Sequence, residues 1–140
     1  MIRKPLPTDV FQINELGSYL DKDFSKKNYI NTYINNNLYI MYVIEENNAV
    51  VGFIMLTTMY ETMELLYLVI DAKYRHMGYG TELLNEVINH KNKESRMILE
   101  VRANNDAAIA FYQKNNFKII NNRHNYYGNN IDAIIMERSI

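Results

Sequence analysis

Apolar and polar positions alternate along this chain in blocks that predict strands and helices in turn. Two apolar runs, residues 38–44 and 50–58, are rich in β-branched and aromatic residues, and the polar stretch 45–48 separates them, which is typical of a β-hairpin. A further apolar run at residues 65–70 predicts a buried strand. The remaining short strands are expected at residues 2–5, 97–101, 117–122 and 131–138.

Helical spacing of apolar residues fills the intervals between these strands. Thr8 or Asp9 is suited to cap a helix that runs to about residue 19, and Ser25 a second that runs to about residue 35. The link between them, residues 20–24, carries several charges and is expected to be exposed. Two later helices are expected at about residues 78–90 and 105–115, the second capped by Asn104 or Asn105 and closed by a left-handed Asn116.

The predicted order, β-α-α-β-β-β-α-β-α-β-β, indicates one α/β (α+β) domain over residues 1–140, with a mixed sheet and helices on both faces. The composition is that of a globular protein, with 48% hydrophobic and 22% charged residues. The net charge of -1 without a dense basic block disfavours nucleic-acid binding. No apolar run reaches membrane-spanning length and the N-terminus does not read as a signal peptide, so a cytoplasmic location is expected.

Metal and thiol chemistry are not expected. The chain has no cysteine, which excludes a thiolate nucleophile or a thiolate metal site. Its histidines, His76, His90 and His124, are far apart and do not have metal-ligand spacing. Candidate chemistry therefore has to come from carboxylates, phenols and backbone groups.

The stretch Asp71–Thr81 is the strongest candidate for a binding site, because it joins a buried strand to the start of a helix. Gly78 and Gly80 allow the backbone to approach a ligand closely. The first turn of a helix has N–H groups without intrahelical partners and a positive dipole end, which together bind anions. Arg75 and His76 add charge nearby. This pattern predicts a phosphate site, and the alternative is an ordinary turn whose glycines ease helix packing.

Two side chains are candidates for proton transfer. Glu100 interrupts an apolar strand, which is costly for a carboxylate unless it is paired or functional; the alternative is an outward Glu paired with Arg102. Tyr112 lies on the apolar side of its helix, where the alternative is a half-buried core tyrosine. Tyr126 and Tyr127 form an aromatic pair on a polar connection, either a stiff loop or one wall of a substrate site.

Several of these motifs resemble one enzyme family. Residues 75–80 resemble the Arg/Gln-x-x-Gly-x-Gly/Ala loop of the GCN5-related N-acetyltransferases (GNAT). Residues 99–112 and the ending 123–136 resemble the bacterial ribosomal-protein-alanine N-acetyltransferases within that family, and the resemblance extends over residues 65–136. It implies a mostly antiparallel sheet of six to seven strands. Two departures stand out: Phe24-Ser25-Lys26 replaces a Pro-Trp-Ser stretch, and Asn116 replaces a glycine.

The resemblance also implies a role for each matching residue, with acetyl-CoA as co-substrate. Glu100 would be the general base and Tyr112 the general acid toward the departing thiolate. Tyr126 and Tyr127 are the candidates for the acceptor side. The residues implied in cofactor binding are Leu68, Val69 and Ile70 for the acyl arm, Arg75, His76, Met77, Gly78, Tyr79, Gly80 and Thr81 for the pyrophosphate, and Asn105.

The expected function is acetylation of a protein N-terminal amine, in particular that of a ribosomal protein beginning with Ala. A small amine or a lysine side chain is the alternative acceptor, and a non-catalytic acyl-CoA-binding module is a further alternative. A dinucleotide oxidoreductase is disfavoured because Leu83 occupies the third glycine position and seven residues separate Ile70 from Gly78. No membrane or nucleic-acid partner is expected, and the chain is expected to be a monomer or a weak dimer.

Overall fold

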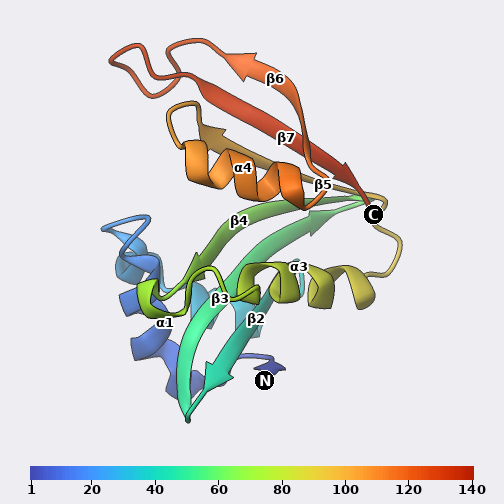
Figure 1. Ribbon diagram of the computed structural model, residues 1–140. Coiled ribbons are helices and arrows are strands. Elements are labelled where there is room, and N and C mark those ends of the chain that lie inside the picture. Colours follow the sequence, from blue (N-terminus) through green and yellow to red (C-terminus); the bar gives the residue numbers. More distant parts are fainter.

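A seven-stranded mixed sheet forms the centre of the molecule (Figure 1). The computed structural model describes residues 1–140 apart from the side chain of Ile34. The strands lie side by side in the order β1-β2-β3-β4-β5-β7-β6, and every neighbouring pair is antiparallel except β4 and β5. Their bounds are β1 (Ile2–Arg3), β2 (Tyr39–Glu46), β3 (Ala49–Met59), β4 (Thr62–Ile70), β5 (Arg96–Arg102), β6 (Lys118–Arg123) and β7 (Ala133–Ser139).

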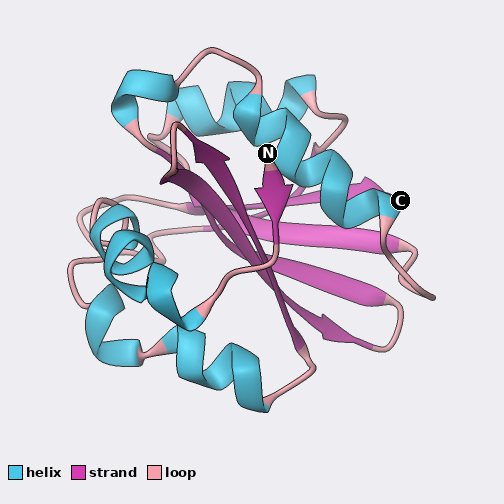
Figure 2. Ribbon diagram, turned by 90° about the horizontal axis from the view of Figure 1, so that it is seen from below, coloured by secondary structure: helices cyan, strands magenta, loops and turns pink.

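Helices cover both faces of this sheet (Figure 2). The α-helices are α1 (Val10–Gly17), α2 (Tyr29–Asn35), α3 (Tyr79–Asn89) and α4 (Asp106–Lys114). Short 3-10 turns are η1 (Pro7–Asp9), η2 (Phe24–Lys27) and η3 (Ala72–Tyr74). The expected fold class, a mostly antiparallel mixed sheet with helices on both faces, is therefore confirmed.

Each face of the sheet has its own hydrophobic core. One core joins α3 and α4 to the sheet through Leu83, Leu84 and Tyr112, and its side of the sheet is called here the α3/α4 face. The other joins α1 and the α1–α2 link through Ile13 and Phe24, and its side is called the α1/α2 face. The hydrophobic effect explains this arrangement, since each amphipathic helix removes one apolar stripe from water against the sheet.

The parallel strands β4 and β5 run together for a short distance only. They are paired in register at Thr62–Glu64 and Arg96–Ile98, and beyond these residues the two strands diverge. Figure 1 shows the strands meeting at the right of the view and spreading toward the left, with α3 and α4 in front. The divergence leaves one edge of β4 without a neighbouring strand after Glu64.

The segment before β2 differs from the prediction. The helix expected from Ser25 is interrupted, because Asn28 has a left-handed backbone (φ 50°) that ends η2 and precedes α2. The link 20–24 was expected to be exposed, yet Phe24 is fully buried. Its ring occupies the space beside Gly17, where an added Cβ would lie 2.4 Å from the ring. Burial of a single aromatic side chain outweighs the charge of its neighbours, since one ring removes a large apolar area from water.

Other local predictions agree with the structure. Asn105 caps α4, since its Oδ1 accepts a hydrogen bond from the Ala108 N–H at 3.1 Å. Asn116 has the expected left-handed backbone, with φ of 71°. Asp9 does not cap α1; its carboxylate instead accepts hydrogen bonds from Arg3 and from the Leu6 N–H. That ion pair fastens the start of the chain to the first helix.

Candidate active site

The free edge of β4 presents backbone groups that the sheet does not use. The Asp71 N–H donates to the Val51 carbonyl of β3, so by strand alternation the backbone of Ile70 and Leu68 faces away from β3 and into the divergence. Val69 pairs with Phe53, and its backbone faces β3. Of the three residues expected to contact an acyl arm through their backbones, Leu68 and Ile70 are therefore placed to do so and Val69 is not.

The loop after β4 leads into the N-terminus of α3, as the sequence predicts. Arg75 turns back toward the strand, where its Nε donates to the Ile70 carbonyl at 3.1 Å. His76 and Gly78 both have a left-handed backbone, with φ of 63° and 86°. Nothing lies within 4 Å of the position that a Cβ at Gly78 would occupy. The first-turn N–H groups of α3, from Tyr79 onward, thus begin beside open space, which suits an anion.

Glycine is favoured at positions 78 and 80 for different structural reasons. Gly78 is favoured by its positive φ. Gly80 is buried against α4, and a Cβ added there would lie 2.9 Å from Cζ of Phe111. Gly80 therefore permits close packing of two helices, which is the alternative that the sequence left open, while Gly78 borders the space where a ligand would lie.

Glu100 and Tyr112 lie on opposite faces of β5. Met97, Leu99 and Val101 belong to the core of the α3/α4 face, and Tyr112 on α4 belongs to the same core. Successive side chains of a strand point to opposite faces, so Glu100 faces the α1/α2 side. A carboxylate and a phenol are thus available on the two sides of the strand that borders the divergence.

Glu100 is held by residues of the β6–β7 connection. The Tyr127 hydroxyl donates to Oε2 of Glu100 at 3.1 Å, and a guanidinium nitrogen of Arg123 lies 3.7 Å from Oε1. Arg102 is not its partner; this guanidinium lies over the Tyr127 ring, 4.3 Å from the centroid. The alternative interpretation, in which Glu100 pairs with Arg102, does not hold, because Arg102 lies over the tyrosine ring instead. The carboxylate side chain remains 31% exposed, so it can still be reached.

The connection itself is stiffened by Asp132. Its carboxylate accepts a hydrogen bond from the Asn125 N–H at 2.7 Å and lies 3.1 Å from His124. The backbone hydrogen bond and the neighbouring imidazole lower the pKa of Asp132. Tyr126 packs edge-on against Tyr127, with centroids 5.2 Å apart, and is exposed. Burial and the charge of Glu100 raise the pKa of Tyr127, which therefore keeps its proton and donates.

Tyr112 is buried in the core, in agreement with the alternative drawn from its sequence context. Burial raises the pKa of its phenol well above the ordinary value, so the hydroxyl stays protonated. Within the described part of the chain, the only buried side-chain nitrogen or oxygen without a hydrogen-bond partner is Arg96 Nε. The Tyr112 hydroxyl also lacks a hydrogen-bond partner in this part of the protein. Because it is not among the buried atoms that lack one, its oxygen is in contact with solvent. A core position and a role in proton transfer are thus compatible.

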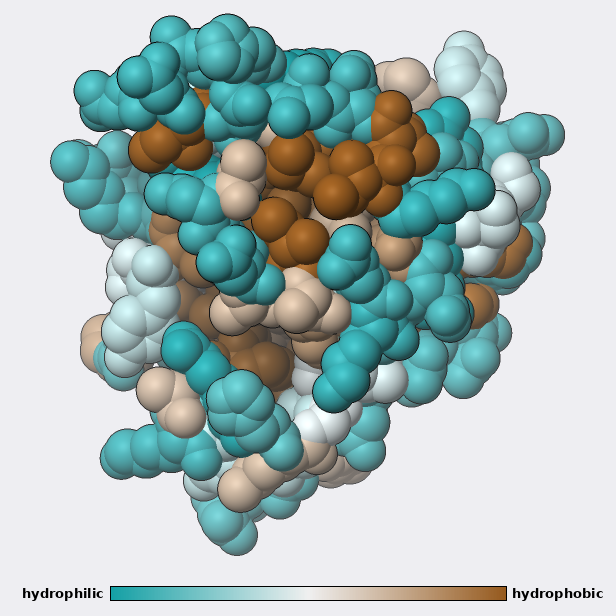
Figure 3. Space-filling model, turned by 45° about the horizontal axis from the view of Figure 1, so that its top comes forward, coloured by the Kyte–Doolittle hydropathy of each residue, from teal (hydrophilic) through white to brown (hydrophobic). Residues whose placement is uncertain are grey.

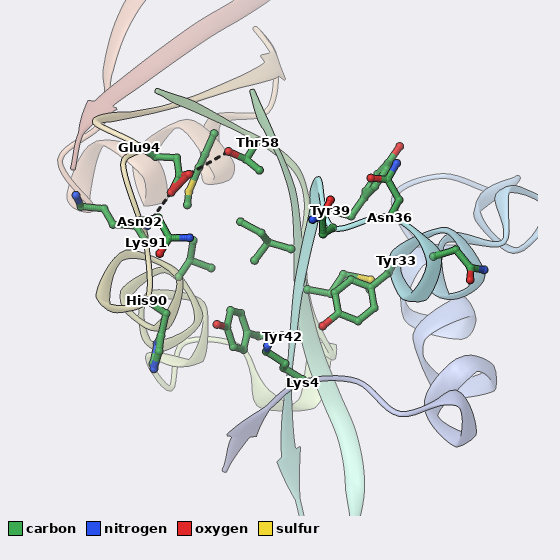
Figure 4. Close-up of a pocket in the computed structure, with 16 residues that line it drawn as sticks. Lys4, Tyr33, Asn36, Tyr39, Tyr42, Thr58, His90, Lys91, Asn92 and Glu94 are labelled. Carbon is green, nitrogen blue, oxygen red and sulfur yellow. Dashed lines mark hydrogen bonds between the residues drawn. The ribbon is translucent and has the colours of Figure 1, made fainter. Parts of the chain in front are cut away.

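Figure 3 shows apolar side chains gathered in the middle of the molecular face in view, with hydrophilic ones on either side. A hollow of about 790 Å³ follows the edge of β2 and is lined by Tyr33, Tyr42, His90 and Glu94 among others (Figure 4). None of the predicted site residues lines that hollow. The arrangement described above, rather than this hollow, is therefore the candidate active site.

No group of three or more His, Asp or Glu side chains lies close enough together to hold a metal ion in the described part of the chain. No helix among the described residues has both the length and the apolar composition needed to cross a membrane.

A polar network on the α1/α2 face was missed by the sequence analysis. The Tyr67 hydroxyl of β4 donates to Oδ2 of Asp21 at 3.1 Å, and Lys27 Nζ donates to the same oxygen at 2.6 Å. Phe24 packs edge-on against the Tyr67 ring, with centroids 4.9 Å apart. Only the clustering of charges around Phe24 hinted at this contact, since the strand partner is more than forty residues away along the chain.

The chain matches the acetyltransferase (GNAT) family over residues 8–117. The [ribosomal protein bS18]-alanine N-acetyltransferase of Escherichia coli (strain K12) is 32% identical over 103 residues, which cover 70% of each protein. A crystal structure of the Escherichia coli ribosomal-protein-S18-alanine N-acetyltransferase superimposes with a TM-score of 0.83 at 26% identity, over 100% of this chain and 93% of that one.

Two further relatives differ in extent. N-alpha-acetyltransferase 50 of zebrafish (Danio rerio) is 39% identical over 74 residues, which are 49% of this chain and only 44% of that protein. A Bacillus anthracis structure solved in complex with acetyl coenzyme A has a TM-score of 0.74 at 28% identity, covering 79% of this chain and 67% of that one. The expectation of an acyltransferase enzyme is thus confirmed at the level of the family. On the extent of these matches, this chain belongs to the acetyltransferase (GNAT) family.

Proposed function

We propose that this protein transfers an acetyl group from acetyl-CoA to the N-terminal α-amine of a protein. The observation that carries the proposal is the divergence of β4 from β5. Glu100 lies on one face of β5 at this opening, and Tyr112 lies on the other. Two substrates can then approach from opposite faces and meet at the free edge of β4. The family membership supports acetyl transfer as the reaction.

The residues present fit acetyl-CoA. An extended acyl arm needs backbone partners, which the free edge of β4 offers at Leu68 and at the Ile70 N–H, since the Ile70 carbonyl accepts from Arg75. A pyrophosphate needs clustered donors, which the first turn of α3 offers beside Gly78. Arg75, His76, Met77, Tyr79 and Thr81 belong to the same loop and turn, whereas Asn105 caps α4 and would contact the cofactor from there. The related structure with bound acetyl coenzyme A supports this choice of co-substrate.

The proposed chemistry uses both faces of β5. Acetyl-CoA supplies an acetyl group already activated as a thioester, so an acyl-enzyme is unnecessary. Only the neutral amine attacks, and a peptide α-amine with a pKa of about 8 is mostly protonated at pH 7. Glu100 takes the proton from the amine, directly or through a water, on the α1/α2 side. Tyr112 gives its proton to the departing thiolate on the α3/α4 side.

The acceptor class rests on the relatives and on the tyrosine pair. The Escherichia coli relative is named for alanine of ribosomal protein bS18, and the zebrafish relative is an N-alpha-acetyltransferase. Tyr127 donates to Glu100 and Tyr126 packs against Tyr127, so the pair would border the path of an extended peptide. We therefore assign the acceptor as the N-terminus of a protein, with a ribosomal protein that begins with Ala as the first candidate.

One experiment tests this function. The protein is incubated with acetyl-CoA and peptides that differ in their first residue, and the products are located by tandem mass spectrometry. Acetylation at the α-amine supports the proposal, and a preference for Ala at the first position supports the ribosomal acceptor. Matched peptides with a blocked α-amine and one internal lysine form the control set. Acetylation of the lysine alone would contradict the proposed acceptor.

A further inference from the structure

The network around Tyr67 lies where the two proposed substrates meet. Tyr67 pairs with Met55 of β3. The preceding residue, Leu66, has no partner in β3, because the register of the two strands shifts there. Its next neighbour is Leu68, whose backbone faces the divergence. Tyr67 packs with the core of the α1/α2 face, the face that also presents Glu100. The Tyr67 side chain is thus on the acceptor side of the strand that would hold the acetyl group.

Tyr67 is joined to the α1–α2 link, residues 20–28, by two kinds of contact. Its hydroxyl donates to Asp21 at 3.1 Å and accepts from Lys27 Nζ at 3.3 Å. Its ring packs against Phe24 and against Tyr29, with centroids 4.9 Å and 5.6 Å away. Figure 1 shows this blue segment and the β6–β7 connection toward the same end of the sheet. The link therefore forms the second border of the acceptor side, opposite Tyr126 and Tyr127.

The charges of the network are stable near neutral pH. The hydrogen bond from Lys27 lowers the pKa of Asp21, and the same contact raises the pKa of Lys27. Burial raises the pKa of Tyr67 to about 12. At pH 7 the network therefore consists of a carboxylate, an ammonium and a protonated phenol that connects them to β4. The three groups satisfy one another, so they hold the link in place without needing a ligand.

We infer that Tyr67 is a positioning residue for the acceptor: its hydroxyl fastens the α1–α2 link to β4, so that this link and the acetyl-bearing edge keep a constant spacing. The inference rests on the proposed function. It assigns to Tyr67 an effect on acceptor binding and none on acetyl-CoA binding, because the hydroxyl faces the α1/α2 side.

Tyr67→Phe tests the inference, because it removes the hydroxyl and keeps the ring that packs on Phe24. The KM for the acceptor peptide is expected to rise roughly fivefold to tenfold, with the KM for acetyl-CoA unchanged and kcat within about twofold. Tyr33→Phe is the matched control: this α2 tyrosine packs on the same core, and its hydroxyl has no hydrogen-bond partner among the described residues. The control is expected to behave as the wild type.

A second readout does not depend on turnover. Hydrogen–deuterium exchange of peptides that cover residues 20–28 is expected to speed up in Tyr67→Phe and to stay unchanged in Tyr33→Phe. Asp21→Asn is expected to act in the same direction, and the double variant to raise peptide KM by less than the product of the two single effects. A less than multiplicative effect is the signature of two groups that act through one contact.

The outcomes separate the two proposals. If the wild type acetylates no peptide, the proposed function fails, and the inference fails with it. If the wild type is active and Tyr67→Phe leaves peptide KM unchanged, the inference alone fails, even where exchange at residues 20–28 has increased. If peptide KM and acetyl-CoA KM rise together, the hydroxyl supports the site as a whole, and the assignment to the acceptor is overturned.

Discussion

Glu100 and Tyr112 lie on opposite sides of the same strand, β5, one on the face shared with α1 and α2 and the other under α4. In the proposed mechanism, this relationship puts the two proton transfers on different sides of the sheet.

Glu100→Gln removes the proposed base and keeps its size and its ability to accept from Tyr127. We expect kcat/KM to fall by roughly 10²–10⁴ near neutral pH, with acetyl-CoA affinity unchanged, and part of the loss to return at alkaline pH where the amine is already neutral. Steady-state kinetics from pH 6 to about 9.5 measure this. Glu137→Gln, a carboxylate of β7 paired with Arg96, is the control. Wild-type activity of Glu100→Gln at every pH would rule out the base.

Tyr112→Phe removes the proposed acid and keeps the packing of the ring. Because burial raises the pKa of this phenol, the proton is present throughout the neutral range, and its loss should lower kcat by roughly a hundredfold with little change in the KM for acetyl-CoA. Tyr42→Phe makes the same change to another tyrosine of the same core and serves for comparison. Equal turnover of the two variants would leave Tyr112 with a packing role alone.

Gly78 offers a sharper test of the phosphate site than Gly80. An Asp at Gly80 would collide with Phe111, whereas a side chain at Gly78 meets open space. Asp and Asn have the same shape and tolerate left-handed backbone, so Gly78→Asp and Gly78→Asn differ in charge alone. Charge repulsion should make acetyl-CoA bind roughly tenfold or more weakly to the Asp variant than to the Asn variant. Calorimetry gives both affinities, and equal values would place the phosphates elsewhere.

Truncation of both Tyr126 and Tyr127 to Ala should raise the KM for the acceptor peptide and leave acetyl-CoA binding intact, because Tyr127 donates to Glu100 on the proposed acceptor side and Tyr126 packs against Tyr127. The expected rise is roughly tenfold. Peptide kinetics at saturating acetyl-CoA measure it, and Tyr19→Ala, an exposed tyrosine just after α1, is the control. Should the double variant match the wild type, the connection is only a stiff loop.

Asp9 predicts a pH dependence of folding stability. Its hydrogen bonds and ion pair with Arg3 lower its pKa below the ordinary value of about 3.9. The stabilisation is therefore complete above that ordinary value and is lost as the pH falls through the folded-state pKa. Asp9→Asn should lower the free energy of unfolding by about 1–2 kcal/mol at pH 7 and flatten its decline below pH 4. Urea unfolding at several pH values measures both effects, and a parallel decline in the two proteins would contradict the assignment.

Local chemistry made much of the fold predictable from the sequence. The hairpin between β2 and β3 turns at Asn47 and Asn48, and both adopt the left-handed backbone that such a turn needs. The cap at Asn105 and the strand–loop–helix order around Gly78 follow from residues close together in the chain. The same is true of the alternation that puts Glu100 on the opposite face from Leu99.

Contacts between distant residues were not predictable in this way. Phe24 is buried because Gly17 and Tyr67 leave room for its ring, and neither fact can be read from its charged neighbours. The spacing of two along a strand offered Arg102 as an alternative partner for Glu100. Tyr127, which arrives from a later connection, stacks on that arginine and takes its place. The sequence thus predicted which residues belong to the candidate site, but not which side chains they contact.

The short pairing between β4 and β5 has a consequence for how the protein responds to its ligands. Three residue pairs, Thr62–Glu64 with Arg96–Ile98, are the hydrogen-bonded seam between the two halves of the sheet. An extended molecule that bonds to Leu68 and Ile70 would continue the sheet across the opening, as a guest strand. Cofactor binding would then stabilise both halves of the sheet together, so that the melting temperature rises with cofactor concentration.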